Sequence, residues 1–171
     1  MIKFNLTNTI DRPIETVFSF LSDPNNMPLW NYYIQSVSII TATTNGVGTS
    51  FQITRKHDSH LYKVIELMPG HKINIELQPP GPLQRFGFTL SKQDDKTFVV
   101  YDWEVELGKY KALKYVPKGF IKNGLLSFAK RHILKHTKPA TGQNFDKLKT
   151  LLETGKVTLQ DGRNITLPDN I

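Results

Sequence analysis

The sequence predicts one α+β domain in which a seven-stranded antiparallel sheet packs on a long C-terminal helix. Three observations support this prediction. Residues 2–10 alternate apolar and polar side chains, and a short apolar helical face follows at 14–21. Six more alternating segments run from residue 34 to residue 107 and are linked mainly by short turns. A Lys-rich stretch with helical spacing completes the pattern at 120–153. Such strands and connections are typical of an antiparallel meander with one apolar face.

Two short helices are expected between the first and second strands. Asp11 is placed to cap the first helix, and Pro13 lies in its first turn, because the free amides of a helix start favour an acceptor and tolerate proline. Pro24 follows an aspartate and stops this helix, and Pro28 interrupts the second one, which leads to Trp30. The strands themselves are expected at residues 2–10, 34–43, 51–56, 61–67, 73–77, 86–90 and 99–107.

The C-terminal helix is predicted from an apolar stripe that should face the sheet. Pro139 and Gly142 should kink or break it before a second stretch at 145–153. We therefore assign residues 1–155 to the domain and residues 156–171 to a C-terminal extension. An Asp-Gly pair at 161–162 predicts a hairpin there. A hairpin is marginal alone, so it must dock on its own domain or on a partner subunit of a homodimer; a frayed tail is the alternative.

Composition narrows the class of protein. The chain has 171 residues, 39% of them hydrophobic, and no cysteine. It is long enough to bury a core without cross-links, and it can have neither a disulfide framework nor a thiol nucleophile. The N-terminus lacks the apolar run of a signal peptide, and no segment approaches the length of a membrane span. We expect a cytoplasmic protein.

The order of elements resembles the SRPBCC superfamily, the helix-grip fold of START-like lipid-binding domains and polyketide cyclases. The resemblance covers roughly residues 2–155 and rests on the Pro-broken helices before Trp30, the long run of strands and the amphipathic helix ending at 148–153. It implies that the curved sheet wraps around the long helix and that an elongated apolar cavity lies between them. It also implies binding or transport of a hydrophobic small molecule such as a lipid, an isoprenoid or a polyketide-like aromatic.

The resemblance and the strand parity together indicate which side chains line that cavity. Aromatic residues on the inner faces suit a flat or elongated apolar ligand, although at these spacings aromatic residues also fill ordinary cores. The predicted ligand-binding residues are Trp30, Tyr32, Phe51, Arg55, Phe88, Tyr101, Trp103, Phe120, Ile121, Leu125 and Phe128, with Ile53 and Ile75 beside them.

Catalysis is the alternative function, and it would use groups in the same cavity. Family members that shape polyketides use Arg, Tyr and carboxylate side chains, and here those roles could fall to Arg55, Tyr101 and Tyr32. The Arg55 guanidinium could hold a carboxylate or phenolate, or it could pair with Asp58 at the strand end. No motif identifies catalytic residues or a cofactor, and we expect neither a cofactor nor a metal. His132 and His136 have the i, i+4 spacing of two metal ligands on one helix face, but no third ligand accompanies them.

Positive charge is concentrated near the C-terminus. The net charge is +7, and residues 109–149 hold 11 of the 22 basic residues but only one acid. This excess can serve solubility alone, or it can dock the helix on an anionic membrane or an acidic partner. Sequence-specific nucleic-acid binding is not expected, because the stretch contains no recognised reading motif.

Overall fold

A computed structural model of the chain describes residues 1–41, 46–107 and 120–168. Seven strands form one antiparallel sheet in the order β1-β7-β6-β5-β4-β3-β2. Their bounds are β1 Ile2–Ile10, β2 Ile34–Ile39, β3 Ser50–Arg55, β4 Ser59–Met68, β5 Lys72–Leu77, β6 Leu83–Gln93 and β7 Lys96–Glu106. From β2 to β7 each strand pairs with the next one along the chain, so these six strands form a meander. β1 pairs with β7 and forms the other edge of the sheet. The predicted α+β helix-grip fold is confirmed.

Two short helical segments separate β1 from β2, as the sequence predicts. The helix α1 spans Ile14–Ser22, and a 3₁₀ turn, η1, spans Pro24–Leu29. Asp23 ends α1 in an extended conformation, and its side chain accepts a hydrogen bond from the backbone N–H of Asn25 to cap η1. The expected cap of α1 by Asp11 is wrong. Pro13 occupies the cap position, and the backbone N–H of Asp11 instead donates to Glu153.

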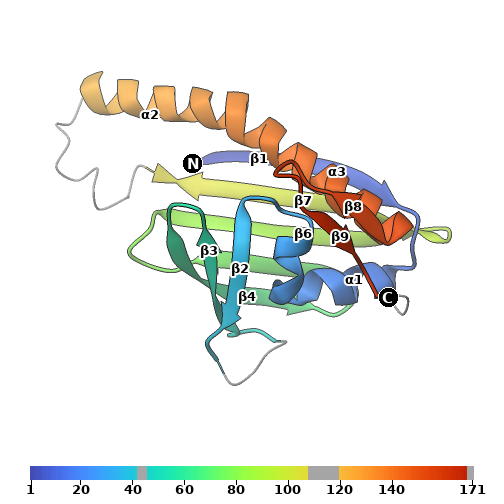
Figure 1. The fold of residues 1–171 in the computed structure, drawn as a ribbon. Helices are drawn as coiled ribbons and strands as arrows, with labels where there is room; N and C mark the ends of the chain where they lie inside the picture. Colours follow the sequence, from blue (N-terminus) through green and yellow to red (C-terminus); the bar gives the residue numbers. More distant parts are fainter. Residues whose placement is uncertain (42–45, 108–119, 169–171) are drawn as a thin grey trace.

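The C-terminal helix runs as one rod with an internal π turn. It consists of α2 (Phe120–His132), the π turn η4 (Ile133–Thr137) and α3 (Lys138–Thr154). The helix does not break at Pro139 or Gly142, and the turn just before Pro139 is widened instead. Proline has no N–H to bond the carbonyl four residues earlier, and a widened turn accommodates that loss without ending the helix. Figure 1 shows α3 lying along β1 and α2 extending past the end of β7. None of these helices has the length and apolar character needed to cross a membrane, within the described ranges.

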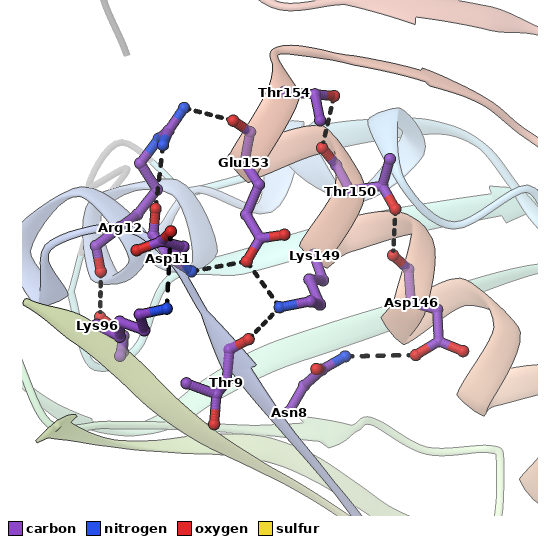
Figure 2. Close-up of polar contacts among 11 residues, drawn as sticks. Asn8, Thr9, Asp11, Arg12, Lys96, Asp146, Lys149, Thr150, Glu153 and Thr154 are labelled. Atoms are coloured by element: carbon purple, nitrogen blue, oxygen red, sulfur yellow. Dashed lines mark hydrogen bonds and ion pairs between the residues drawn. The ribbon is translucent and has the colours of Figure 1, made fainter.

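Polar contacts fasten the C-terminal half of α3 to the start of the chain (Figure 2). Lys149 donates to the backbone carbonyl of Thr9 and to Glu153 Oε1, the latter over 2.7 Å. Glu153 Oε1 also accepts the Asp11 N–H at 2.7 Å, and Arg12 donates to the Glu153 carbonyl at 2.6 Å. Beneath them, the apolar side chains of α3 are buried in the main core, and the helix packs on β1. The α3 half of the helix is therefore a fixed part of the core.

The last residues form a hairpin that docks on the same chain. Strands β8 (Lys156–Thr158) and β9 (Asn164–Thr166) pair antiparallel, and Gly162 takes the positive φ that the turn requires. Three apolar side chains of this segment are buried in the main core. Arg163 donates to the backbone carbonyls of Pro28, Tyr32 and Ile34. The hairpin thus braces the connection between η1 and β2 without a partner subunit.

Candidate ligand-binding site

A cavity of about 430 Å³ lies between the inner face of the sheet, the η1–β2 connection and the middle of the long helix. Its volume falls within the usual range of small-molecule sites. The connection contributes Met27, Trp30, Asn31, Tyr33 and Ile34; the strands contribute Ile53, Arg55, Tyr62, Gln84, Phe86, Tyr101 and Trp103; and the helix contributes His132, His136, Thr137, Ala140, Thr141 and Asn144.

Aromatic side chains from three strands form the floor of this cavity. The ring centroids of Tyr62 and Phe86 are 5.8 Å apart, and those of Phe86 and Tyr101 are 6.3 Å apart. Phe88 packs behind them, 5.2 Å from Tyr101. The register explains the cluster: Phe86 lies opposite Trp103 and Phe88 opposite Tyr101 on the paired strands β6 and β7. Aromatic pairs at these separations stabilise the sheet beyond their burial, and they present ring surfaces to a ligand.

The two tyrosines of the floor are held in their neutral form. Burial raises the pKa of Tyr101 far above its ordinary value. Burial also raises the pKa of Tyr62, and the nearby Arg55 guanidinium offsets only part of that effect. Removal from water disfavours a phenolate. These hydroxyl groups can therefore donate or accept hydrogen bonds at neutral pH, but they do not act as bases.

Arg55 reaches the cavity at its edge, where its charge is already paired. Its Nε donates to Asp58 Oδ1 at 2.6 Å and its second terminal nitrogen to Asp58 Oδ2 at 3.0 Å. This is the strand-end pairing that the sequence left open. The two parallel hydrogen bonds hold the Arg55 guanidinium and the Asp58 carboxylate in one plane at the cavity wall. A ligand carboxylate would have to compete with Asp58 for the guanidinium.

The helix wall combines imidazole, hydroxyl and amide groups at the π turn. The rings of His132 and His136 are 4.7 Å apart on one face of the helix. No group of three His, Asp or Glu side chains that could hold a metal occurs among the described residues. The Thr141 hydroxyl donates to the backbone carbonyl of Thr137. Ala140 is the small, apolar residue among those that the helix contributes to the cavity.

A hydrogen-bonded amide pair connects the helix wall to the η1–β2 connection. Asn144 is 1% exposed, and its Nδ2 donates to Asn31 Oδ1 at 3.0 Å. Neither residue is among those predicted from the sequence. A signal was present: Asn144 precedes Leu148 by four residues and Leu151 by seven, so it lies on the buried stripe of α3. A polar residue on an apolar stripe is a candidate for a site.

The structure brings four of the predicted ligand-binding residues to the cavity: Trp30, Arg55, Tyr101 and Trp103. Ile53 joins them. Phe51 and Phe88 are fully buried and pack in the core beside the cavity instead of lining it, as does Ile75.

Other predicted residues lie away from the cavity. Tyr32 faces the C-terminal hairpin side, and its neighbour Tyr33 lines the cavity instead. Leu125 and Phe128 do not face the sheet as expected: they are 42% and 68% exposed, because α2 extends beyond the strands that were to cover it. The side chains of Phe120 and Ile121 lie outside the described part of the chain.

Solved structures share the fold at low sequence identity. The di-domain aromatase/cyclase StfQ of the steffimycin biosynthetic pathway is 11% identical with a TM-score of 0.66, covering 89% of this chain and 50% of that one. The protein TTHA0849 from Thermus thermophilus is 15% identical with a TM-score of 0.64, covering 88% and 96%. The Aha1 dimer from Colwellia psychrerythraea is 18% identical with a TM-score of 0.61, covering 92% and 100%.

A family comparison goes further than these structural likenesses, although no curated protein sequence matches the chain. The model of the family described as polyketide cyclase/dehydrase and lipid transport matches residues 1–132. That range runs from β1 to the end of α2 and includes every strand of the large sheet. The SRPBCC resemblance is thereby confirmed, and the chain belongs to the polyketide cyclase/dehydrase and lipid transport family.

Proposed function

We propose that this chain binds or transports a hydrophobic small molecule in the cavity between the sheet and the long helix. The observation that carries the proposal is the cavity itself: about 430 Å³, with a floor of aromatic rings and a helix wall centred on Ala140. Apolar walls with a few fixed polar groups are typical of small-molecule sites. Family membership supports the same function, and it leaves lipid, isoprenoid and polyketide-like aromatic ligands as candidates.

Tryptophan fluorescence offers a direct test, because both tryptophans of the chain line the cavity. Titration with 1-dodecanol, which does not absorb where tryptophan does, should shift the emission in a saturable way. Ala140→Leu should weaken binding about tenfold, since added methyl groups occupy the ligand's space. Ala129→Leu is the matched control: it makes the same change on the same rod outside the cavity. Equal affinity in all three proteins, or no saturable change in the wild type, would contradict the proposal.

Fewer observations support the alternative function, that of a cyclase or dehydrase. It needs two or more acid/base groups converging on the ligand. Of the three residues named for it, Tyr32 lies outside the cavity, Arg55 is paired with Asp58, and Tyr101 is a neutral phenol. Tyr101→Phe tests the phenol: loss of turnover with unchanged ligand affinity would favour catalysis, and unchanged turnover would remove Tyr101 as its acid.

A second function is favoured by the surface of α2. Leu125 and Phe128 are exposed there, and Lys130, Arg131 and Lys135 are exposed beside them. An amphipathic helix with apolar and cationic residues at its surface suits the interface of an anionic membrane. We propose that α2 docks on such a surface, where a carrier would collect or release its ligand.

Vesicle flotation separates this docking from general charge. Vesicles containing phosphatidylserine should bind the protein at low salt and release it as salt rises. Changing Lys130, Arg131 and Lys135 to Gln should abolish binding, whereas the same change at Lys63, Lys92 and Lys156 should not. Phe128→Ser should weaken binding at every salt concentration. Absence of binding at low salt would refute membrane docking, and the positive charge of α2 would then serve solubility alone.

A further inference from the structure

Two tyrosine hydroxyl groups of the cavity floor have no hydrogen-bond partner in the protein. Tyr62 and Tyr101 line the cavity and are 4% and 8% exposed. Neither hydroxyl is bonded to a described residue. Among the described residues, Asn144 Oδ1 is the one side-chain polar atom that has neither a partner nor accessible surface. The hydroxyls of Tyr62 and Tyr101 therefore keep accessible surface, and the pocket that both residues line is the cavity.

The two hydroxyl-bearing rings flank an apolar ring. Phe86 lies on β6, between β4 with Tyr62 and β7 with Tyr101 in the order of the sheet. Its ring centroid is 5.8 Å from that of Tyr62 and 6.3 Å from that of Tyr101. A flat apolar molecule that stacks over the floor would thus have a phenol on each side of it.

Other polar groups of the lining are donors as well. Trp30 and Trp103 line the cavity, and neither indole N–H is bonded to a described residue. An indole N–H can only donate. Gln84 lies two residues before Phe86 on the same face of β6, and its amide is also without a partner among the described residues. A phenol hydroxyl donates better than it accepts, because its oxygen shares a lone pair with the ring. The lining therefore favours a ligand that accepts hydrogen bonds.

We infer that the ligand of this cavity is a neutral apolar molecule with a ketone or ester carbonyl, whose oxygen accepts a hydrogen bond from the hydroxyl of Tyr62 or Tyr101. This inference rests on the proposed function of the cavity, and it adds the chemical class of the ligand. The aromatic floor binds the apolar body, and the hydroxyl groups select the carbonyl.

The cavity favours a carbonyl over a carboxylate, which is also an acceptor. Burial raises the pKa of Tyr62 and of Tyr101, so the floor penalises negative charge. The Arg55 guanidinium, a strong cation at the cavity edge, is bonded to both oxygens of Asp58. A neutral carbonyl accepts the same hydrogen bonds without bringing a charge into this environment.

Equilibrium dialysis of the full chain against two matched probes tests the inference. The probes are 2-acetylnaphthalene, a ketone, and 2-isopropenylnaphthalene, which has the same shape with CH₂ in place of the oxygen. The double variant Tyr62→Phe/Tyr101→Phe removes both hydroxyls and keeps the rings. It should lower the ratio of ketone affinity to hydrocarbon affinity about tenfold. Tyr32→Phe, which removes a hydroxyl outside the cavity, should leave that ratio unchanged.

Infrared spectra give a second readout. A hydrogen bond weakens the C=O bond, so the stretching frequency of the bound ketone should be lower in the wild type than in the double variant. Retained binding of 2-isopropenylnaphthalene shows that the variant is folded with an open cavity. The carboxylate 2-naphthoate should bind the wild type more weakly than the ketone does.

Two results would overturn the inference while leaving the proposed function standing. One is a double variant that keeps the affinity ratio and the carbonyl frequency of the wild type. The other is a wild type that binds 2-naphthoate at least as tightly as the ketone. Failure of the wild type to bind any of the three probes would contradict the proposed function itself, and the inference with it.

Discussion

The two halves of the long helix differ in what covers them. In α3, the side chains of Phe145, Leu148 and Leu151 are at most 3% exposed. In α2, Leu125 and Phe128 are largely exposed, although their spacing is equally regular. The hydrogen bonds and ion pairs described for the rod also lie in η4 and α3, with the strongest group around Glu153 (Figure 2).

The cavity lies where these halves meet. Its helix wall runs from His132, the last residue of α2, through the π turn to Asn144 in the second turn of α3. One end of the rod is thus anchored and the other carries exposed apolar and basic residues, with the proposed ligand between them. Helical periodicity alone therefore does not tell which part of an amphipathic helix supplies stability and which part supplies function.

Truncation of a core leucine should show the largest difference between the halves. Leu148→Ala should cost about 3 kcal/mol of unfolding free energy, because the Leu148 side chain is fully buried and its truncation leaves a cavity in the core. Leu125→Ala on α2 should change it by less than about 0.5 kcal/mol. Urea unfolding followed by circular dichroism measures both. Similar costs at the two positions would mean that α2 is covered as α3 is.

Loss of the hairpin brace should rank next. Arg163→Ala removes donors from three backbone carbonyls of the η1–β2 connection, and we expect a loss of about 2 kcal/mol. Arg131→Ala, an exposed arginine of α2, is the control and should be nearly neutral. Ligand affinity should fall with Arg163→Ala as well, since Asn31 and Tyr33 of that connection line the cavity. Unchanged stability would show that the hairpin only rests on the domain.

Acid sensitivity should come from the α3 anchor. Partial burial alone would raise the pKa of Glu153, but hydrogen bonds from Lys149 and the Asp11 N–H outweigh it and lower that pKa below 4.5. A carboxyl with a lowered folded-state pKa stabilises the protein fully above the unfolded value. That contribution is lost as pH falls from 4.5 through the folded pKa.

Glu153→Gln should therefore cost about 1 kcal/mol at neutral pH, discounted for the exposure of this group. Below pH 4.5 the variant and the wild type should converge. Thermal unfolding across pH measures the effect, with Glu15→Gln on the surface of α1 as the control. A constant difference at all pH values would indicate a loss of packing and not of charge.

Sequence pattern predicted the fold well because every strand has one buried face. The alternation along β5 and β7 reports that burial directly. It also identified Arg55, Tyr101 and Trp103, which line the cavity. The same parity placed Phe51 and Phe88 there, yet they pack in the core, because parity identifies the inner face of a sheet but not which part of that face is left uncovered.

The helix wall of the site was harder to predict. Asn144 and Asn31 are polar residues far apart in sequence, and only the folded chain places their amides 3.0 Å apart. Tyr32 and Tyr33 are adjacent, and parity does not apply in an irregular connection, so the wrong one was chosen. Leu125 and Phe128 were placed on the cavity because periodicity identifies an apolar face and says nothing of the surface opposite to it.

Native mass spectrometry of the freshly purified chain tests the central claim most directly. We predict a mass above that of the polypeptide, released on denaturation as a defined apolar molecule. Ala140→Leu should carry much less of it, and Ala129→Leu should carry as much as the wild type. A wild type with the bare polypeptide mass that also gains none with added 1-dodecanol, or an equal load in Ala140→Leu, would contradict binding in this cavity.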